Sequence, residues 1–363
     1  MKQHLLKLLF ISLITSYSFV FANELHLTKQ QALQMGFTKS NFVRQNPRGT
    51  ADLPAHALSW PVQFVDSKHT IGNSMPEYQN YGDEAYYHEG ADLRVSPKGE
   101  VKAPVDGFLQ ADYYSYVTDQ QTGQDQKYTK PITAGGDDLY FEVTIKTADG
   151  FQFEFHHVNA QSLPKNIYDL AVQGGGPITR GQTIGFASLW PTSRMGARYD
   201  HIHYNLISPT GVYMNTEYYS QELGDTSSPV VKNIFAIYKN KKTEVVNQKL
   251  ESIPSELIIS TYDMKATNIY PLPPTLIEAS WGADNKVGWN FTQTFMTSSG
   301  TYPDIREVYA RNLRLDDGRS FTTLGDYDST LFLFRLKLPA TATLPITLTV
   351  QDVSGNQTKI ILN

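Results

Sequence analysis

Three short segments carry most of the side chains in this chain that could do chemistry. They are His-Glu-Gly-Ala-Asp at residues 88–92, Phe-His-His at 155–157 and His-Ile-His at 201–203. Together they hold five of the nine histidines, and the sequence contains no cysteine. A catalytic zinc ion uses about three nitrogen or oxygen ligands and leaves one position open for water. The three segments therefore predict a mononuclear zinc site with hydrolytic chemistry.

The spacing within the segments indicates which side chains would share this site. Residues i and i+2 of a β-strand point to the same face, so His201 and His203 share one face and one can bind metal while the other does acid–base work. Gly90 allows the backbone to turn or to approach a neighbour closely. Asp92 then begins an alternating run that is typical of a strand. We expect His88, Asp92 and His203 to be the three ligands.

The sequence around these segments resembles the LytM/lysostaphin-type zinc metallopeptidases. The resemblance is carried by Gly-Glu-Val-Lys-Ala-Pro-Val-Asp-Gly at residues 99–107, Gly-Gln-Thr-Ile-Gly at 181–185 and Asp-His-Ile-His-Tyr at 200–204. It covers roughly residues 60 to 220, and the motifs occur in the order found in that family. The resemblance implies zinc bound by His88, Asp92 and His203, and a catalytic pair, His157 and His201, beside the metal-bound water. Which of the pair is the general base stays open.

The resemblance also has departures. Val158 and Asn159 replace the usual Leu-Ser, and His156 is an additional histidine next to the predicted one. We assign the catalytic position to His157 because Phe155 occupies the aromatic position two residues before it. Strand alternation would then place His156 on the opposite face.

The family uses a tyrosine upstream of the first ligand to stabilise the transition state. Four tyrosines lie in the corresponding stretch, and the sequence does not distinguish among them: Tyr78, Tyr81, Tyr86 and Tyr87.

Residues 1–22 resemble a secretory signal peptide. They combine Lys2 and Lys7 with an apolar run and end in Val-Phe-Ala, a small-residue cleavage site. The apolar run is shorter than the roughly 20 residues that span a bilayer, although an uncleaved anchor is the alternative. We expect an exported protein, periplasmic or extracellular, with no stable membrane insertion after cleavage. The absence of cysteine excludes disulfides and a lipid-modified cysteine, and the net charge of −5 gives no reason to expect a nucleic-acid partner.

Length and patterning predict an all-β chain with two main parts. At 363 residues the chain is long for one domain. Residues 23–60 form a lead-in segment, either an extended arm or one that starts a short helix at Thr28. Residues 61–222 form a LytM-like antiparallel β-sheet catalytic domain, in which two alternating runs flank the turn signal Asp149-Gly150 and deliver His157 to a strand end.

A change in composition at residues 224–229 predicts a linker. Beyond it, residues 228–363 read as short strands, and a turn after Asp352 resembles the last hairpin of immunoglobulin-like β-sandwiches. This sandwich domain has no histidine, which excludes a second metal site of the same kind. It is interpreted as a spacer or substrate-positioning module, or alternatively as a structural cap.

The residues and the resemblance together predict an exported zinc metalloendopeptidase. The predicted site would hydrolyse a peptide bond, and the resemblance points to the peptide cross-links of peptidoglycan as substrate. One alternative is a non-catalytic LytM-like protein that binds and activates cell-wall amidases. Another is an adhesion protein with a structural metal, although a structural zinc site normally has four protein ligands.

Overall fold

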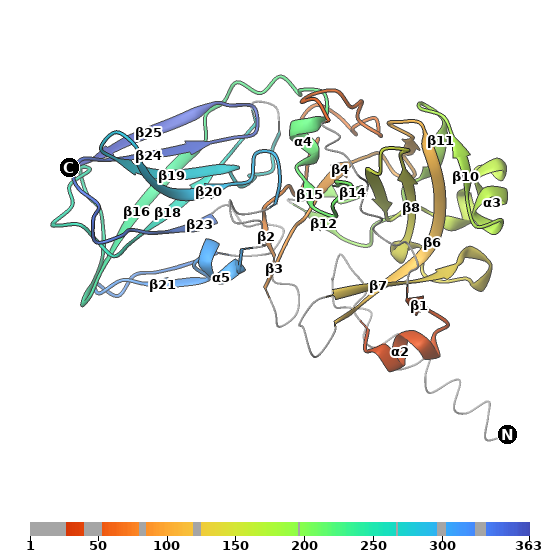
Figure 1. Cartoon of the computed structure of the whole chain (residues 1–363), viewed down its shortest axis with the longest axis horizontal. Coiled ribbons are helices and arrows are strands. Elements are labelled where there is room, and N and C mark those ends of the chain that lie inside the picture. The colour runs from red at the N-terminus through yellow and green to blue at the C-terminus, as the bar shows by residue number, and fades with distance from the viewer. Residues whose placement is uncertain are drawn as a thin grey trace.

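The computed structural model describes residues 27–39, 53–79, 85–118, 125–194, 197–265, 268–295, 303–323 and 332–363. The predicted signal peptide and Tyr81 lie outside these residues. The described chain forms two β-rich parts that lie side by side along the long axis of the molecule (Figure 1). The strand pairings within the sheets are antiparallel, so the expected all-β fold is confirmed. None of the described helices is long and apolar enough to span a membrane.

The first part is built on a nine-stranded sheet of described residues. Its main path is β1 (Thr38–Lys39), β7 (Asp125–Pro131), β6 (Gly107–Thr118), β8 (Phe141–Lys146), β9 (Gln152–His156), β14 (His201–Ile207) and β15 (Tyr213–Met214). In addition, β4 (Ala91–Arg94) pairs with β14, and β10 (Gly176–Ile178) pairs with β6. The smaller elements are β2 (Tyr78–Gln79), β3 (Tyr86–Tyr87), β5 (Glu100–Lys102), β11 (Thr183–Phe186), β12 (Ser193–Arg194), β13 (Ala197–Arg198), α2 (Lys29–Gln34), α3 (Lys165–Val172) and α4 (Thr216–Tyr219).

The central strands of this sheet have one apolar face and one polar face. On β14, Ile202, Tyr204 and Leu206 belong to the main hydrophobic core, whereas His201, His203 and Asn205 alternate with them. All six side chains are buried. The polar face of β14 is therefore enclosed rather than solvated, which requires its polar groups to find partners within the protein.

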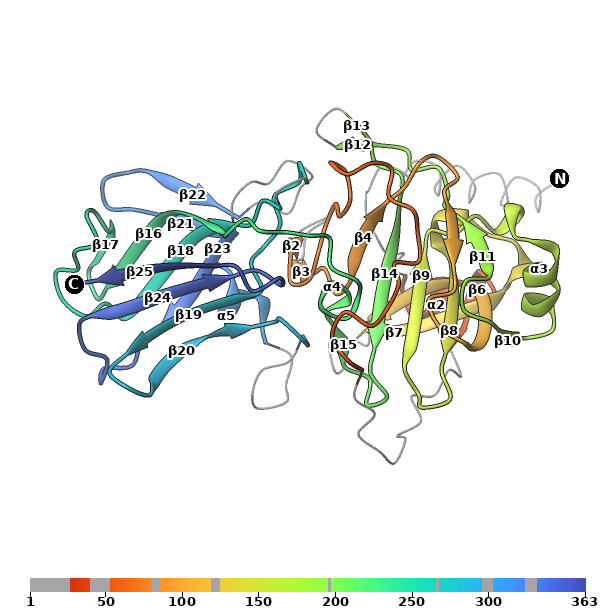
Figure 2. The same cartoon turned by 90° about the horizontal axis from the view of Figure 1, so that it is seen from above.

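The second part is a β-sandwich, as expected. One sheet has the order β17 (Lys241–Glu244), β16 (Val230–Tyr238), β18 (Glu256–Tyr262) and β23 (Phe332–Lys337). The other has the order β20 (Asn285–Asn290), β19 (Leu276–Trp281), β24 (Ile346–Gln351) and β25 (Gln357–Leu362). A short helix, α5 (Ile305–Val308), and the pair β21 (Asn312–Arg314) and β22 (Ser320–Thr322) complete it. Figure 2 shows the two sheets layered against each other, and their inner side chains form a second apolar core.

The two parts pack against each other. Ile207 and Tyr213 of the first part belong to the core of the sandwich. The Tyr309 hydroxyl of the sandwich donates to the Pro76 carbonyl at 2.9 Å, and the Asn268 side-chain amide donates to the Ile71 carbonyl at 2.8 Å. The sandwich is therefore in direct contact with the sheet that carries the histidines.

The lead-in segment forms the short helix that the sequence offered as one of two alternatives. Thr28 is the N-cap of α2, and its side chain exchanges hydrogen bonds with Gln31 in a capping box. Ala32 and Phe37 are buried in the main core. An extended arm is therefore wrong for residues 27–39.

Candidate metal centre

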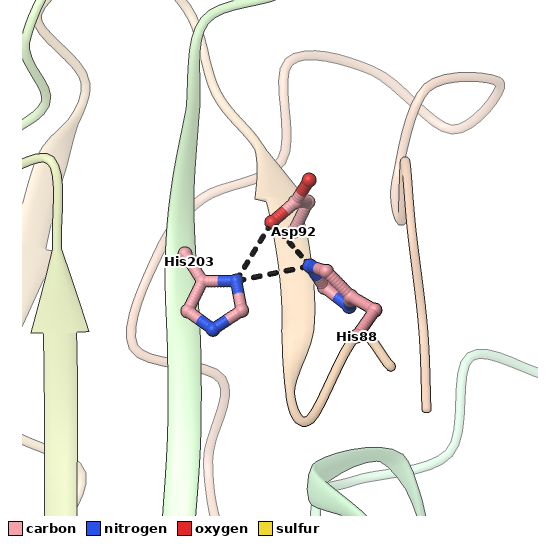
Figure 3. A group of neighbouring side chains, drawn as sticks. All are labelled: His88, Asp92 and His203. Carbon is pink, nitrogen blue, oxygen red and sulfur yellow. Dashed lines mark hydrogen bonds and ion pairs between the residues drawn. The ribbon is translucent and has the colours of Figure 1, made fainter. Parts of the chain in front are cut away.

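Two paired strands and the turn before one of them bring the three predicted ligands together. In the antiparallel register of β4 and β14, Asp92 lies directly opposite His203. His88 precedes β4 by a tight turn, in which a Cβ atom on Gly90 would lie 2.4 Å from the Tyr204 carbonyl oxygen. This close approach is the reason for a glycine at that position. His88 Nε2 lies 3.0 Å from both Asp92 Oδ1 and His203 Nδ1, and the last two atoms are 3.1 Å apart (Figure 3).

In each histidine ring, the hydrogen bond of the nitrogen that faces away from the cluster determines which nitrogen carries the proton. The Nδ1–H of His88 donates to the Gly90 carbonyl at 3.1 Å, and the Nε2–H of His203 donates to Asn205 Oδ1 at 2.9 Å. Each neutral ring then points a lone pair at the other and at the carboxylate. Three converging lone pairs repel one another unless a cation lies between them. Tetrahedral zinc ligands at about 2.1 Å from the metal would lie about 3.4 Å apart, close to the separations seen here. The three residues could therefore hold a metal ion.

The electrostatics of the cluster favour these ligand states for His203 and Asp92. For His88, burial lowers the pKa, but the Asp92 carboxylate outweighs this and raises it above its usual value. Burial, together with the charge of His88, lowers the pKa of His203 to about 4. Burial raises the pKa of Asp92, but the nearby His201 and His88 outweigh this, and the pKa lies well below its usual value. His203 is thus neutral and Asp92 ionised at neutral pH, as metal ligands must be.

The two predicted catalytic histidines lie beside the three ligands. The Nδ1–H of His201 donates to the Tyr199 carbonyl at 2.8 Å, and that of His157 donates to the Leu139 carbonyl at 2.6 Å. The Nε2 atoms have no hydrogen-bond partner among the described residues, and the ring centroids are 5.0 Å apart. Burial lowers the pKa of both rings. Two neutral imidazoles, each with a free Nε2 lone pair, are therefore held next to the metal-ligating group.

The prediction that His156 lies on the opposite face is wrong. The β9–β14 register pairs His156 with His203, so both point to the polar face, with ring centroids 5.2 Å apart. His157 also reaches this face because it lies just beyond β9 and takes a left-handed backbone conformation, with φ of 64°. Simple alternation fails at this residue because the strand has already ended.

His156 belongs to a separate buried cluster. Its Nε2 lies 3.2 Å from Glu142 and 3.5 Å from Glu154, and Lys127 Nζ bridges the same two carboxyl groups at 2.6 and 2.7 Å. Burial lowers the pKa of His156, but hydrogen bonds to Glu142 and Glu154 outweigh this and raise it to about 9. Two acidic groups thus face two basic groups. Asn205 connects this cluster to His203, because its amide also donates to Glu154 at 3.3 Å.

Among the described residues, a tyrosine that was not named from the sequence contacts one of the ligands. Tyr78 and Tyr87 pack on Tyr309 of the sandwich, with ring centroids 5.6 and 6.2 Å from it. The Tyr199 hydroxyl instead lies 3.0 Å from Asp92 Oδ2 and donates to it. Tyr199 could have been found from the sequence, because it lies two residues before His201 and continues the alternation of β14 towards the N-terminus.

Aromatic side chains and an arginine cover the site. The Trp190 ring lies 4.4 Å from that of His201 and 4.7 Å from that of His157. The Arg94 guanidinium lies 4.3 Å from the Tyr199 ring centroid and 5.2 Å from that of Tyr270, a residue of the second part. Trp190 and Tyr199 thus both lie against the histidines. The His88, Asp92 and His203 side chains are at most 6% exposed.

Comparisons with known proteins leave the identity open. No protein-family model and no curated protein matches the sequence. Among solved structures, the SpoIIQ–SpoIIIAH pore-forming complex aligns with 17% identity over 45% of this chain and 90% of the other, with a TM-score of 0.28. A protein of Pseudomonas aeruginosa described as a candidate M23 peptidase aligns with 17% identity over 49% of this chain and 53% of the other, with a TM-score of 0.26. TM-scores this low carry no argument about function.

Proposed function

We propose that the chain is an exported zinc-dependent endopeptidase that hydrolyses the peptide cross-links of peptidoglycan. The observation that supports it best is the convergence of three ligand atoms from His88, Asp92 and His203 beside two neutral histidines. The choice of zinc follows from the ligand set of two imidazoles and one carboxylate. The choice of substrate rests on the sequence motifs alone, and export rests on residues 1–22.

Each residue has a defined task in this proposal. His88, Asp92 and His203 hold the zinc, which supplies a Lewis acid to polarise the scissile carbonyl and activate water. One of His157 and His201 accepts a proton at its free Nε2, and the other, once protonated, donates to the developing charge or to the leaving amine. The carbonyls of Leu139 and Tyr199 keep both rings in the required tautomer.

Substrate entry requires side chains to move, because the cluster is enclosed. Trp190 contacts both catalytic histidines and belongs to a small buried aromatic group with Tyr199 and Tyr270. Opening of this cover would let a peptide carbonyl approach the ligands from the side of the catalytic histidines. We therefore place the substrate-binding face at the Trp190 side of the site.

The enclosed site also supports a second candidate, the non-catalytic protein that docks onto cell-wall amidases. A docking protein does not need an accessible metal. It also does not need two histidines with free Nε2 atoms beside the ligands, and for this reason the peptidase is the better account.

Purified peptidoglycan distinguishes the two candidates. The zinc-loaded protein should release soluble peptides, a chelator should stop the release, and added zinc should restore it. His201→Ala, which leaves the three ligands intact, should bind zinc but release nothing. A zinc-loaded wild-type protein that leaves peptidoglycan intact yet stimulates a wall amidase would establish the docking function instead.

A further inference from the structure

Three aspartates from distant parts of the sequence lie close together where the linker meets the sandwich. Asp225 lies in the linker, Asp263 directly follows β18, and Asp352 directly follows β24. One carboxylate oxygen from each lies within 4.8 Å of those of the other two. Asp263 and Asp352 are 2% and 1% exposed. Such a gathering of buried carboxylates is costly unless positive charge compensates for it.

The described residues around the cluster do not supply that charge. Lys265 is the nearest cation, but its ammonium group pairs with Glu217 at 2.9 Å. Asn356 donates twice to Asp352, from its backbone at 2.9 Å and from its side chain at 2.8 Å, and carries no charge. Four carboxyl groups thus surround one ammonium group. The cluster around His156 is different, because there two acidic groups face two basic ones.

The Asp263 carboxylate provides a second, independent observation. Its Oδ1 atom is buried and accepts no hydrogen bond from any described residue. The backbone of Asp263 is already paired. Its N–H donates to the Leu272 carbonyl at 2.7 Å, and its carbonyl accepts from the Leu272 N–H at 2.8 Å. Buried polar atoms are nearly always satisfied, so an unpartnered carboxylate oxygen in a cluster with two other carboxylates indicates a ligand.

We propose that Asp225, Asp263 and Asp352 bind a hard divalent cation, namely Ca²⁺. An all-oxygen ligand set favours Ca²⁺ or Mg²⁺ over zinc, and Ca²⁺ accepts the irregular geometry that a linker and two strand ends provide. Backbone carbonyls and water complete its coordination. This site is independent of the proposed peptidase activity, because it shares no residue with the His88, Asp92 and His203 cluster.

A cation at this position fixes the linker to the sandwich. Asp225 belongs to the linker, whereas Asp263 and Asp352 belong to opposite sheets of the sandwich. Lys265 extends the connection to Glu217 of α4, in the first part. The cation therefore stabilises the junction between the two parts, and its removal should loosen that junction without changing the histidine site.

Calorimetric titration of the full-length protein with CaCl₂ tests the proposal. Wild type should bind about one Ca²⁺ with a dissociation constant of about 0.1–1 mM, and bind Mg²⁺ more weakly. Asp263→Asn should weaken binding by at least about tenfold, because it removes one ligand charge. Asp284→Asn, an exposed aspartate in the same sandwich, is the matched control and should leave binding unchanged. His203→Ala should also bind Ca²⁺ normally, which separates this site from the zinc site.

Thermal unfolding in metal-free buffer excludes a trivial loss of fold. Asp263→Asn should melt at a higher temperature than wild type without Ca²⁺, because no carboxyl group is then buried at that position, and should gain less than wild type when Ca²⁺ is added. Asp352→Asn is the second variant should Asp263→Asn fail to fold. No calcium binding by wild type at about 10 mM, tighter binding of Mg²⁺ than of Ca²⁺, or undiminished binding in both variants would overturn the proposal.

Discussion

Two groups of three ligand-type side chains among the described residues differ in how they are held. His88, Asp92 and His203 sit on paired strands and a tight turn, so the sheet register fixes their spacing. Asp225, Asp263 and Asp352 come from a linker and two strand ends and meet only through the tertiary fold. The first group offers nitrogen and oxygen lone pairs on rigid backbone, which suits zinc. The second offers only oxygen on irregular backbone, which suits calcium.

A third group shows that proximity alone does not make a metal site. Glu142, Glu154 and His156 also lie within 4.8 Å of one another, and all three are buried. Lys127, however, bridges the two glutamates, and His156 is a second basic group. The charges within this cluster are therefore balanced without a metal. The balance of charge, rather than the presence of ligand-type residues, separates the three groups.

The largest effect is expected for His203→Ala. This change removes one of only three ligands, so zinc should fall from about one per chain to nearly none, and hydrolysis should be lost. Metal analysis by mass spectrometry measures the content. His56→Ala, a partly exposed histidine outside the cluster, should keep its zinc. Full zinc retention in His203→Ala would show that the ligand assignment is incorrect.

His201→Ala and His157→Ala should retain zinc but lose turnover. A positioned acid or base contributes about 10²- to 10⁴-fold to the rate, so kcat should fall by that factor in each variant. Steady-state kinetics on a soluble cross-link peptide, with zinc content measured on the same samples, tests this. Loss of zinc in either variant would move that histidine from the catalytic pair to the ligand set.

Asn205→Ala should weaken zinc binding without abolishing it. Asn205 accepts the Nε2–H of His203 and so holds the ring with Nδ1 towards the metal. Loss of such a supporting hydrogen bond typically lowers metal affinity by about 10- to 100-fold. Competition with a chromophoric chelator measures the change, with Asn285→Ala on the sandwich surface as control. Equal zinc affinities in the two variants would show that Asn205 does not support the His203 ligand.

The last expected effect is the pH dependence of the aspartate cluster. Burial raises the pKa of Asp263 to about 8. The positive charge of Lys265 lowers this pKa, whereas three neighbouring acidic groups raise it further: Asp352, Asp225 and Glu217. Between its ordinary value of 3.8 and about 8, the folded state then holds a proton that the unfolded state has released. Folding stability is therefore lost as pH rises through this window.

In calcium-free buffer, the melting temperature of wild type should fall relative to Asp263→Asn between about pH 5 and about pH 8. Added Ca²⁺ should reduce the difference, because the cation binds the ionised form. Parallel melting curves for the two proteins across this range would show that Asp263 does not titrate as described.

Much of the fold and of the histidine site follows from local patterns in the sequence. The short strand-like runs beyond the linker predicted the sandwich, and the spacing of His201 and His203 predicted their shared face. The orientation of His156 was missed because it depends on the residue at which β9 ends. Tyr270 was missed because its contact with Arg94 joins residues 176 positions apart. The aspartate cluster had no local signal, since three lone aspartates near turns are ordinary.

The contact of Tyr270 also changes the interpretation of the two parts. From the sequence, the sandwich was interpreted as a spacer, a substrate-positioning module or a structural cap, with no residue in the site. The structure places Tyr270 against Arg94, which in turn stacks on Tyr199, the partner of Asp92. The sandwich therefore supports the residues that orient a ligand.

Mass spectrometry of the peptides released from purified peptidoglycan is the most direct test of the central claim. With zinc-loaded wild type, the account predicts products whose cross-links are opened by addition of one water at a peptide bond, and none with His201→Ala. Intact cross-links after incubation with a protein that demonstrably carries zinc at His88, Asp92 and His203 would contradict it.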